Sequence, residues 1–206
     1  MKSNILEFER FKIKTHENVF SPRHDIGIYS EALKGIIKKN SKMLELGTGT
    51  GAISISLAKS FNSISILATD INPYAIKIAK QNAHINEVDG IISFKKSNWF
   101  SDIPIEKYDF IVTNPPYLSK KNSIFYSNLS DPRSSLYSEN NGLEDIFSIM
   151  KNSINYLNVN SYLIIEHSHN QTLFLKNYGI HLGLKFVKSQ KDDLGFNRIL
   201  ILSNWI

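Results

Sequence analysis

The chain has 206 residues, of which 42% are hydrophobic, so it is long enough and apolar enough to bury the core of one domain. It has no run of 18 apolar residues, no cysteine and no apolar stretch near its N-terminus. These features argue against a membrane span, disulfides, cysteine-based zinc sites and a signal peptide, and we expect a soluble, cytosolic protein. The net charge of +5 permits contact with RNA or the ribosome without requiring it.

The first thirty residues are predicted to form an arm ahead of the main fold. Apolar and charged residues nearly alternate over residues 5–20, which predicts a short hairpin or an extended segment. A turn at residues 21–25 and a helix over residues 28–39 follow. We therefore divide the chain into an N-terminal hairpin or arm, residues 1–30, packed on a main domain, residues 31–206.

The main domain alternates between short apolar runs and helical patterns. The predicted strands cover residues 42–46, 64–69, 91–96, 108–113, 161–166, 185–189 and 198–203. The predicted helices cover residues 52–61, 73–86, 143–157 and 170–178, and a long polar loop covers residues 115–141. Asn72 and Pro73 suit the N-cap and first turn of the second of these helices. The alternation predicts a doubly wound, mostly parallel, seven-stranded α/β sheet, with one antiparallel strand at the C-terminal end.

A glycine-rich turn, Glu45-Leu-Gly-Thr-Gly-Thr-Gly51, separates the first of these strands from its helix. Glycines let a backbone turn tightly and approach a ligand closely. Asp70 ends the next strand, where a carboxylate can bind both hydroxyls of a ribose. A dinucleotide fold is the alternative, but the spacing Gly-x-Gly-x-Gly and the preceding Glu45 disfavour it, because a carboxylate would repel a pyrophosphate. Glu45 suits the cationic methionine end of S-adenosylmethionine instead.

Asn98 and Trp99 follow the third strand and are predicted to border an adenine ring. Trp99 could stack on the ring, and Asn98 could bind its exocyclic amine. The alternative is that Trp99 is a core residue. The residues predicted to bind the cofactor are Glu45, Gly47, Thr48, Gly49, Thr50, Gly51, Asp70, Asn98, Trp99 and Asn114.

The run Asn114-Pro115-Pro116-Tyr117 ends the fourth strand. Neither proline can donate to a sheet, so the turn is rigid and lies at a strand end, where ligands bind in open α/β sheets. The amide of Asn114, the carbonyl of Pro115 and the ring of Tyr117 suit a planar group that carries an NH2. We predict N-methyl transfer here, with Asn114, Pro115, Pro116 and Tyr117 as the catalytic residues. The alternative is a loop that the prolines merely stiffen.

Together these features resemble class I S-adenosylmethionine-dependent methyltransferases and, more narrowly, the PrmC/HemK family. The resemblance covers about residues 6–202 and includes segments that other class I enzymes lack: Phe20–Asp25, Asp131–Leu136 with Asn141-Gly142-Leu143, Glu166-His167 with Gln171, and Asp192–Gly195 with Arg198. Asp131 stands where the family usually has Glu, and Ser168 where it has Gly. The family's bacterial members carry an N-terminal helical domain, whereas this chain starts almost at the predicted hairpin.

The resemblance implies methylation of the side-chain amide of a glutamine, typically in the Gly-Gly-Gln motif of a peptide-chain release factor. Adenine N6-methyltransferases that act on tRNA, rRNA or DNA share the Asn-Pro-Pro-Tyr run, so they remain the alternative, as do a small-molecule or other protein amide substrate and a non-catalytic cofactor-binding module. His167 and His169 alone are weak candidates for a metal site, and we expect no metal. The oligomeric state stays open.

Overall fold

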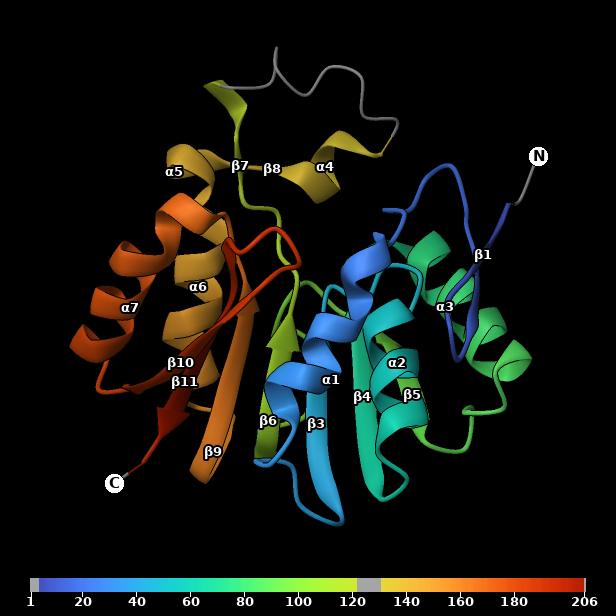
Figure 1. Cartoon of the computed structure of the whole chain (residues 1–206), viewed down its shortest axis with the longest axis horizontal. Helices are drawn as coiled ribbons and strands as arrows, with labels where there is room; N and C mark the ends of the chain where they lie inside the picture. The colour runs from blue at the N-terminus through green and yellow to red at the C-terminus, as the bar shows by residue number, and fades with distance from the viewer. Residues whose placement is uncertain (1–3, 122–130, 206) are drawn as a thin grey trace. The chain divides into compact units, whose positions relative to one another are not determined.

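A computed structural model describes residues 4–121 and 131–205 of the chain (Figure 1). The chain forms two compact units, Met1–Pro104 and Ile105–Ile206, which we describe in turn. Within the described residues, seven strands that are mostly parallel form one sheet. The predicted mostly parallel α/β fold is therefore confirmed.

The first unit contains a hairpin, three parallel strands and their helices. Its elements are β1 (Ile5–Glu7), β2 (Lys12–Lys14), η1 (His24–Gly27), α1 (Ile28–Leu33), β3 (Ser41–Leu46), α2 (Ala52–Ser60), β4 (Ile64–Asp70), α3 (Pro73–Ile85) and β5 (Ile92–Lys96). β1 and β2 pair antiparallel, as the hairpin prediction requires. The proposed domain boundary at residue 30 stays a prediction.

The strands of this unit follow the order β3-β4-β5 and pair in parallel, and α2 and α3 pack on β4 and β5 (Figure 1). β3 is buried almost throughout, because parallel strands covered on both faces need near-continuous apolar runs. α3 begins as predicted, since the side chain of Asn72 accepts a hydrogen bond from Tyr74 N at 2.9 Å and Pro73 occupies the first helical position.

The second unit contains four strands of the sheet and a set of shorter elements. These are β6 (Tyr108–Thr113), β7 (Leu118–Ser119), α4 (Arg133–Leu136), β8 (Tyr137–Ser138), α5 (Glu139–Gly142), α6 (Glu144–Ser153), β9 (Leu157–Glu166), η3 (His169–Gln171), α7 (Thr172–His181), β10 (Lys185–Lys191) and β11 (Asn197–Asn204). The sheet order in this unit is β10-β11-β9-β6.

β6 and β9 pair in parallel, whereas β11 pairs antiparallel with both β9 and β10. The predicted antiparallel strand at the C-terminal end is thus β11. α6 packs on β9, and α7 packs on β10 and β11. The pairing of β10 with β11 is irregular at two places, between Phe186 and Lys188 and between Gln190 and Lys191. β10 is the end strand of the sheet and is largely exposed.

Two helices end earlier than predicted. The helix expected over residues 28–39 ends at Leu33, because Lys34 turns into an extended conformation and Gly35 has a φ of 83°. The helix expected over residues 143–157 ends at Ser153, and β9 begins at Leu157 rather than at residue 161. Asn160 interrupts β9 with a φ of 58° where the pairing with β6 is irregular, which explains why its polar first half does not read as a strand.

The loop expected over residues 115–141 contains structure at both of its described ends, while its residues 122–130 lie outside the described part of the chain. β7 and β8 pair in parallel, and α4 and α5 flank β8. Asn140 and Asn141 have φ values of 51° and 58°, in the left-handed region that asparagine tolerates better than most residues.

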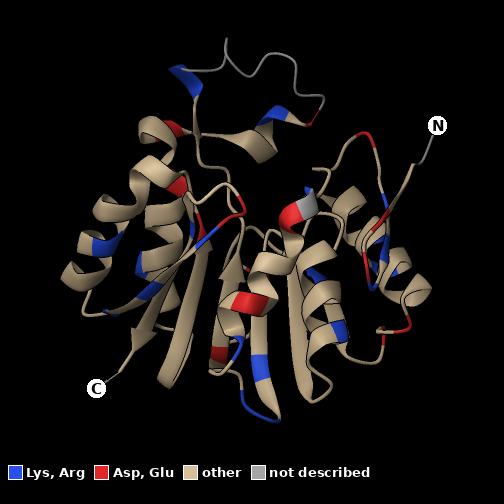
Figure 2. Cartoon of the chain, viewed as in Figure 1, with Lys and Arg blue, Asp and Glu red and all other residues tan. Residues whose placement is uncertain are grey.

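Lys and Arg residues are interspersed with Asp and Glu residues along the ribbon of each unit (Figure 2). The paired lysines at residues 38–39, 95–96 and 120–121 are all exposed. Among the helices of the described residues, none is long and apolar enough to cross a membrane.

Candidate active site

The glycine-rich turn of the first unit is built from residues in the left-handed region. Gly47, Gly49 and Gly51 have φ values of 72°, 56° and 84°, which side chains with a Cβ rarely adopt. The turn is tied to the end of β4, because Thr48 N donates to Thr69 O at 2.8 Å. Glycine at positions 47 and 51 also permits close packing, since an added Cβ would lie 3.3 Å from the Trp99 ring and 3.1 Å from Ala79 Cβ, respectively.

Glu45 places a buried carboxyl group beneath this turn. It is 1% exposed, and its Oε2 accepts hydrogen bonds from Thr48 Oγ1, at 2.8 Å, and from Ser54 Oγ. Its Oε1 is buried and has no hydrogen-bond partner among residues 4–121 and 131–205. Burial raises the pKa of Glu45 to about 7, although the hydroxyls of Ser54 and Thr48 oppose the rise. This orphaned oxygen can accept a hydrogen bond from a donor or cation.

Asp70 joins the end of β4 to the same turn. Its Oδ2 accepts from Gly49 N at 2.9 Å and its Oδ1 from Asn72 N at 2.8 Å. Burial raises the pKa of Asp70, and these backbone donors oppose the rise. Each carboxylate oxygen has two lone pairs, so Asp70 keeps the capacity to accept further hydrogen bonds from hydroxyl groups.

Trp99 lies against the turn, as the contact with Gly47 shows, and has a φ of 47°. Its ring is half-buried, so it is not a core residue, and its backbone is fixed by a hydrogen bond from Ser97 Oγ to Trp99 O at 2.8 Å. The side chain of Asn98 is exposed, and its carbonyl accepts from Ser101 N. The first unit therefore brings Glu45, the glycine-rich turn, Asp70 and Trp99 together.

The Asn114–Tyr117 run belongs to the second unit and follows β6 directly. Pro115 is buried, while Asn114, Pro116 and Tyr117 are half-buried. Within the described ranges, no hydrogen bond engages the side-chain amide of Asn114, whereas Tyr117 is held at two points. The amide of Asn114 thus has its hydrogen-bonding capacity available for a ligand.

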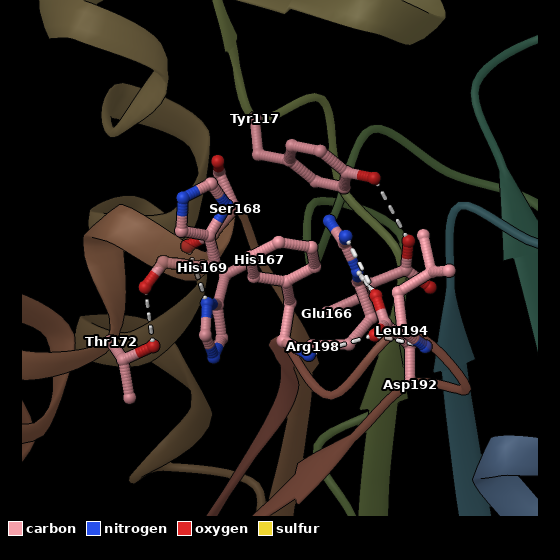
Figure 3. Close-up of polar contacts among 10 residues, drawn as sticks. Tyr117, Glu166, His167, Ser168, His169, Thr172, Asp192, Leu194 and Arg198 are labelled. Carbon is pink, nitrogen blue, oxygen red and sulfur yellow. Dashed lines mark hydrogen bonds and ion pairs between the residues drawn. The ribbon is translucent and has the colours of Figure 1, made fainter.

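Tyr117 is held by the segment that follows β9. Its hydroxyl donates to Glu166 Oε1 at 3.0 Å (Figure 3). Its carbonyl accepts from Gln171 Nε2 at 3.1 Å. Gln171 Oε1 in turn accepts from Ser168 N at 2.9 Å, in a reciprocal capping arrangement at the start of η3. Residues 166–171 therefore fix both the ring and the backbone of Tyr117.

Gly142 allows the chain to pass close to the same tyrosine. A Cβ at this position would lie 2.1 Å from the Tyr117 carbonyl oxygen, and its φ of 85° is also unfavourable for other residues. Gln171 Nε2 reaches the carbonyls of Asn141 and Gly142 at 3.4 and 3.5 Å as well. The Asn141-Gly142 pair and the Asn-Pro-Pro-Tyr run are thus neighbours in space.

An ion pair stabilises the turn between β10 and β11. Asp192 Oδ2 accepts from Arg198 Nε and Nη2 at 3.2 and 2.9 Å, and Oδ1 accepts from the backbone N–H groups of Leu194 and Phe196 (Figure 3). Burial favours the neutral form of Asp192, but these donors outweigh it and lower the pKa of this carboxyl. Arg198 also interacts electrostatically with Glu166 and Tyr117.

His167 is fully buried beside the Asp192–Arg198 ion pair. Its Nδ1 donates to the Ser168 carbonyl at 2.8 Å, because a carbonyl can only accept, and its Nε2 has no partner in the described part of the chain. Burial lowers its pKa, so the imidazole is neutral. Among the described residues, no group of three or more His, Cys, Asp or Glu side chains is placed to hold a metal ion.

Some residues of the site are not among those predicted from the sequence. The resemblance included Gly142, Glu166, Gln171, Asp192 and Arg198 in matching segments but gave them no role. The signal that could have assigned one to Glu166 and Asp192 is a polar side chain at a strand end, since Glu166 ends β9 and Asp192 directly follows β10.

Comparison with known proteins agrees with this arrangement. Residues 10–130 match the family model of the methyltransferase small domain. The chain is 36% identical over 202 residues to the release factor glutamine methyltransferase of Buchnera aphidicola subsp. Acyrthosiphon pisum. This match covers 95% of this chain and 71% of that protein. It is 30% identical over 204 residues to the protein of the same name from Aliivibrio fischeri, with 97% of this chain and 71% of that protein covered.

Solved structures agree on the fold. A methyltransferase from Pyrococcus furiosus superposes with a TM-score of 0.70 at 20% identity, over 94% of this chain and 90% of that chain. The family model and the curated relatives each cover most of the chain, and the relatives are similar along nearly its whole length. The chain therefore belongs to the release factor glutamine methyltransferase family, whose members are S-adenosylmethionine-dependent enzymes with a methyltransferase small domain.

Proposed function

We propose that this enzyme methylates the side-chain amide nitrogen of a glutamine in a peptide-chain release factor. The observation that carries the proposal is the state of the Asn-Pro-Pro-Tyr turn. Glu166 and Gln171 hold Tyr117 at both ends, while the amide of Asn114 has no hydrogen-bond partner in the described ranges. A rigid turn with an available acceptor suits a planar amide.

The methyl donor is S-adenosylmethionine, and the first unit has groups that fit it. The orphaned Oε1 of Glu45 would accept from the ammonium of the methionine moiety, and Asp70 would accept from the ribose hydroxyls. Trp99 would contact the adenine, with Asn98 beside it, and the turn Gly47–Gly51, including Thr48 and Thr50, would approach the ligand with its backbone. Asn114 is the remaining residue that the sequence predicts to bind the cofactor.

The residues of the second unit would orient the substrate. The Asn114 side-chain oxygen and the Pro115 carbonyl would accept the two N–H groups of the amide, with Pro116 keeping the turn rigid and Tyr117 packing on the amide plane. These acceptors would also stabilise the positive charge that develops on nitrogen during the reaction.

When bound, the cofactor supplies a methyl group on a sulfonium, which is already an activated leaving group. Transfer would form the N–C bond as the S–C bond breaks, with the electron pair left on sulfur, and the amide nitrogen held by Asn114 and Pro115 would lose a proton to solvent. An amide nitrogen is a weak nucleophile because its lone pair is delocalised, so the positioning of the amide supplies much of the rate.

The names of the curated relatives favour a release factor glutamine as the acceptor over an adenine. The experiment incubates the enzyme with methyl-labelled S-adenosylmethionine and one acceptor at a time. The acceptors are a release factor with a Gly-Gly-Gln motif, the same factor with that glutamine changed to asparagine, tRNA, rRNA and DNA. Mass spectrometry then locates the label.

We expect label on the glutamine of the first acceptor and none on its asparagine variant. Label on adenine N6 with none on the release factor would overturn the proposal in favour of a nucleic-acid methyltransferase. The RNA reactions also test the contact with RNA or the ribosome that the net charge of +5 permits.

A further inference from the structure

Asn82 of α3 and Asn86, the residue that follows the last turn of α3, bind the backbone of the N-terminal hairpin. Asn86 Oδ1 accepts from Lys12 N at 3.0 Å, and its Nδ2 donates to Lys12 O at 2.7 Å. One turn earlier, Asn82 Oδ1 accepts from Lys14 N at 2.9 Å, and its Nδ2 donates to Lys14 O at 3.0 Å. A side-chain amide has the acceptor and donor of a peptide group, so this pair serves β2 as a neighbouring strand would.

Asn82 makes one contact that Asn86 does not make. Its Nδ2 also donates to the carbonyl of Thr50, at 2.9 Å, within the glycine-rich turn. Asn82 is 0% exposed, so no water competes for these bonds. One NH2 group therefore joins the carbonyl of the hairpin to the carbonyl of the turn.

The segment that follows β2 reaches the other parts of the predicted cofactor site. Asn72 Nδ2 donates to Asn18 O at 2.7 Å, while Asn72 N donates to Asp70 Oδ1. Val19 packs with residues of α3 and lies 4.0 Å from where a Cβ on Gly49 would be. The segment from Lys12 to Val19, which is part of the predicted N-terminal arm of residues 1–30, thus contacts both the glycine-rich turn and the turn that follows Asp70.

We infer that Asn82 is a positioning residue for cofactor binding, through which the arm sets the conformation of the glycine-rich turn. If the Nδ2 group of Asn82 were lost, the buried Thr50 carbonyl would lose its hydrogen-bond donor. The glycine-rich turn would then no longer be connected to the arm through this side chain. The inference depends on the proposed placement of S-adenosylmethionine at this turn, and it is independent of the methyl acceptor.

Asn82→Ala and Asn86→Ala form a matched pair. Each variant removes a buried amide that makes three hydrogen bonds, two of them to β2. The third bond of Asn82 is the one to Thr50, whereas the third bond of Asn86 runs from its Nδ2 to Asn82 O at 2.7 Å. Only the first variant frees Thr50. Isothermal titration calorimetry with S-adenosylhomocysteine measures the dissociation constant. We expect Asn82→Ala to raise it about tenfold or more, and Asn86→Ala to change it less than about threefold.

Asn82→Asp and Asn86→Asp test the same point without leaving a cavity in the core. They replace the alanine variants if one of those does not fold. Asn82→Asp would keep the shape of the side chain and the bond from Lys14 N, but its second carboxylate oxygen could not donate to Thr50. Urea unfolding reports the stability of every variant. Equal dissociation constants for the two members of a pair would overturn the inference and leave Asn82 a purely structural role. An adenine acceptor would defeat the proposed function without altering these constants.

Discussion

Tyr117 and Glu166 lie 49 positions apart in the sequence, yet the hydroxyl of the tyrosine donates to the carboxylate at 3.0 Å. Glu166 ends β9, and the Tyr117 turn follows β6, its parallel neighbour in the sheet. The bond therefore joins two strand ends, which is where an open α/β sheet builds its ligand sites. It also fixes the ring plane that would pack on the substrate amide.

Removing this bond should impair catalysis more than folding. We expect Tyr117→Phe and Glu166→Ala each to lower kcat/KM about tenfold, because each removes one partner of the hydrogen bond and the ring loses its fixed orientation at the substrate. Steady-state methyl transfer to the release factor measures the change, and urea unfolding provides the comparison with stability.

The double variant tests whether the two residues act as one unit. Its loss should be smaller than the product of the single losses, since both changes remove the same interaction. A double variant whose loss equals that product would show that the hydrogen bond has no part in catalysis.

Asn114→Ala should separate cofactor binding from catalysis. We expect methyl transfer to fall by about two to three orders of magnitude, because the substrate amide loses an oriented acceptor. The dissociation constant for S-adenosylhomocysteine should rise much less, because the other residues proposed to bind the cofactor are unchanged. Turnover close to that of the unaltered enzyme would remove Asn114 from the site.

Gly142 should tolerate no side chain. In Gly142→Ala the new Cβ would meet the Tyr117 carbonyl oxygen at 2.1 Å, so the backbone of one segment must shift. Gly183→Ala is the control, because Gly183 has the same φ of 85° with no atom within 4 Å of its added Cβ. The control should cost about 1–2 kcal/mol of unfolding free energy for the left-handed conformation alone.

Gly142→Ala should cost at least about 2 kcal/mol more than this control, and it should also abolish most methyl transfer, since Tyr117 would be displaced. Urea unfolding and the methyl transfer assay measure the two effects. Equal losses of stability in both variants would argue that the segments separate easily.

Glu45 makes stability depend on pH in a direction opposite to that of most carboxylates. Its pKa of about 7 in the folded chain lies above the ordinary value of 4.5, so the folded state holds a proton that the unfolded state has released. Stability should fall as pH rises from about 4.5 to 7, by roughly 3 kcal/mol at most.

Glu45→Gln imitates the protonated form and should remove this contribution. Urea unfolding on either side of the pH window, for both proteins and without cofactor, measures the difference. If the two proteins show parallel pH profiles, the carboxyl group is not the cause.

The sequence was sufficient for features that depend on local chemistry. The Asn72 cap, the Pro73 start of α3, the glycine-rich turn and the seven strands all follow from short patterns. The hydrogen bond from Gln171 to the Tyr117 carbonyl was not predicted. The two residues are 54 positions apart in the sequence, and they come into contact only because β6 and β9 pair. The cofactor and catalytic assignments of individual residues stay predictions.

Asn82 illustrates the same limit. It stands on the buried face of α3 with Ala75, Ile78, Ala79 and Ala83, where a polar residue contradicts the apolar pattern. That contradiction is the only local sign of its role, because its partners lie 68 and 32 positions away. A polar residue on an apolar helix face is thus a useful indicator of a long-range contact.

The two irregularities of β10 have a consequence for association between molecules. An end strand with a regular ladder offers its free N–H and C=O groups as a template for another chain. β10 departs from regular pairing twice within seven residues and carries Lys185, Lys188 and Lys191. A second strand could not align with it over any useful length and would meet a row of positive charges, so this border of the sheet resists polymerisation.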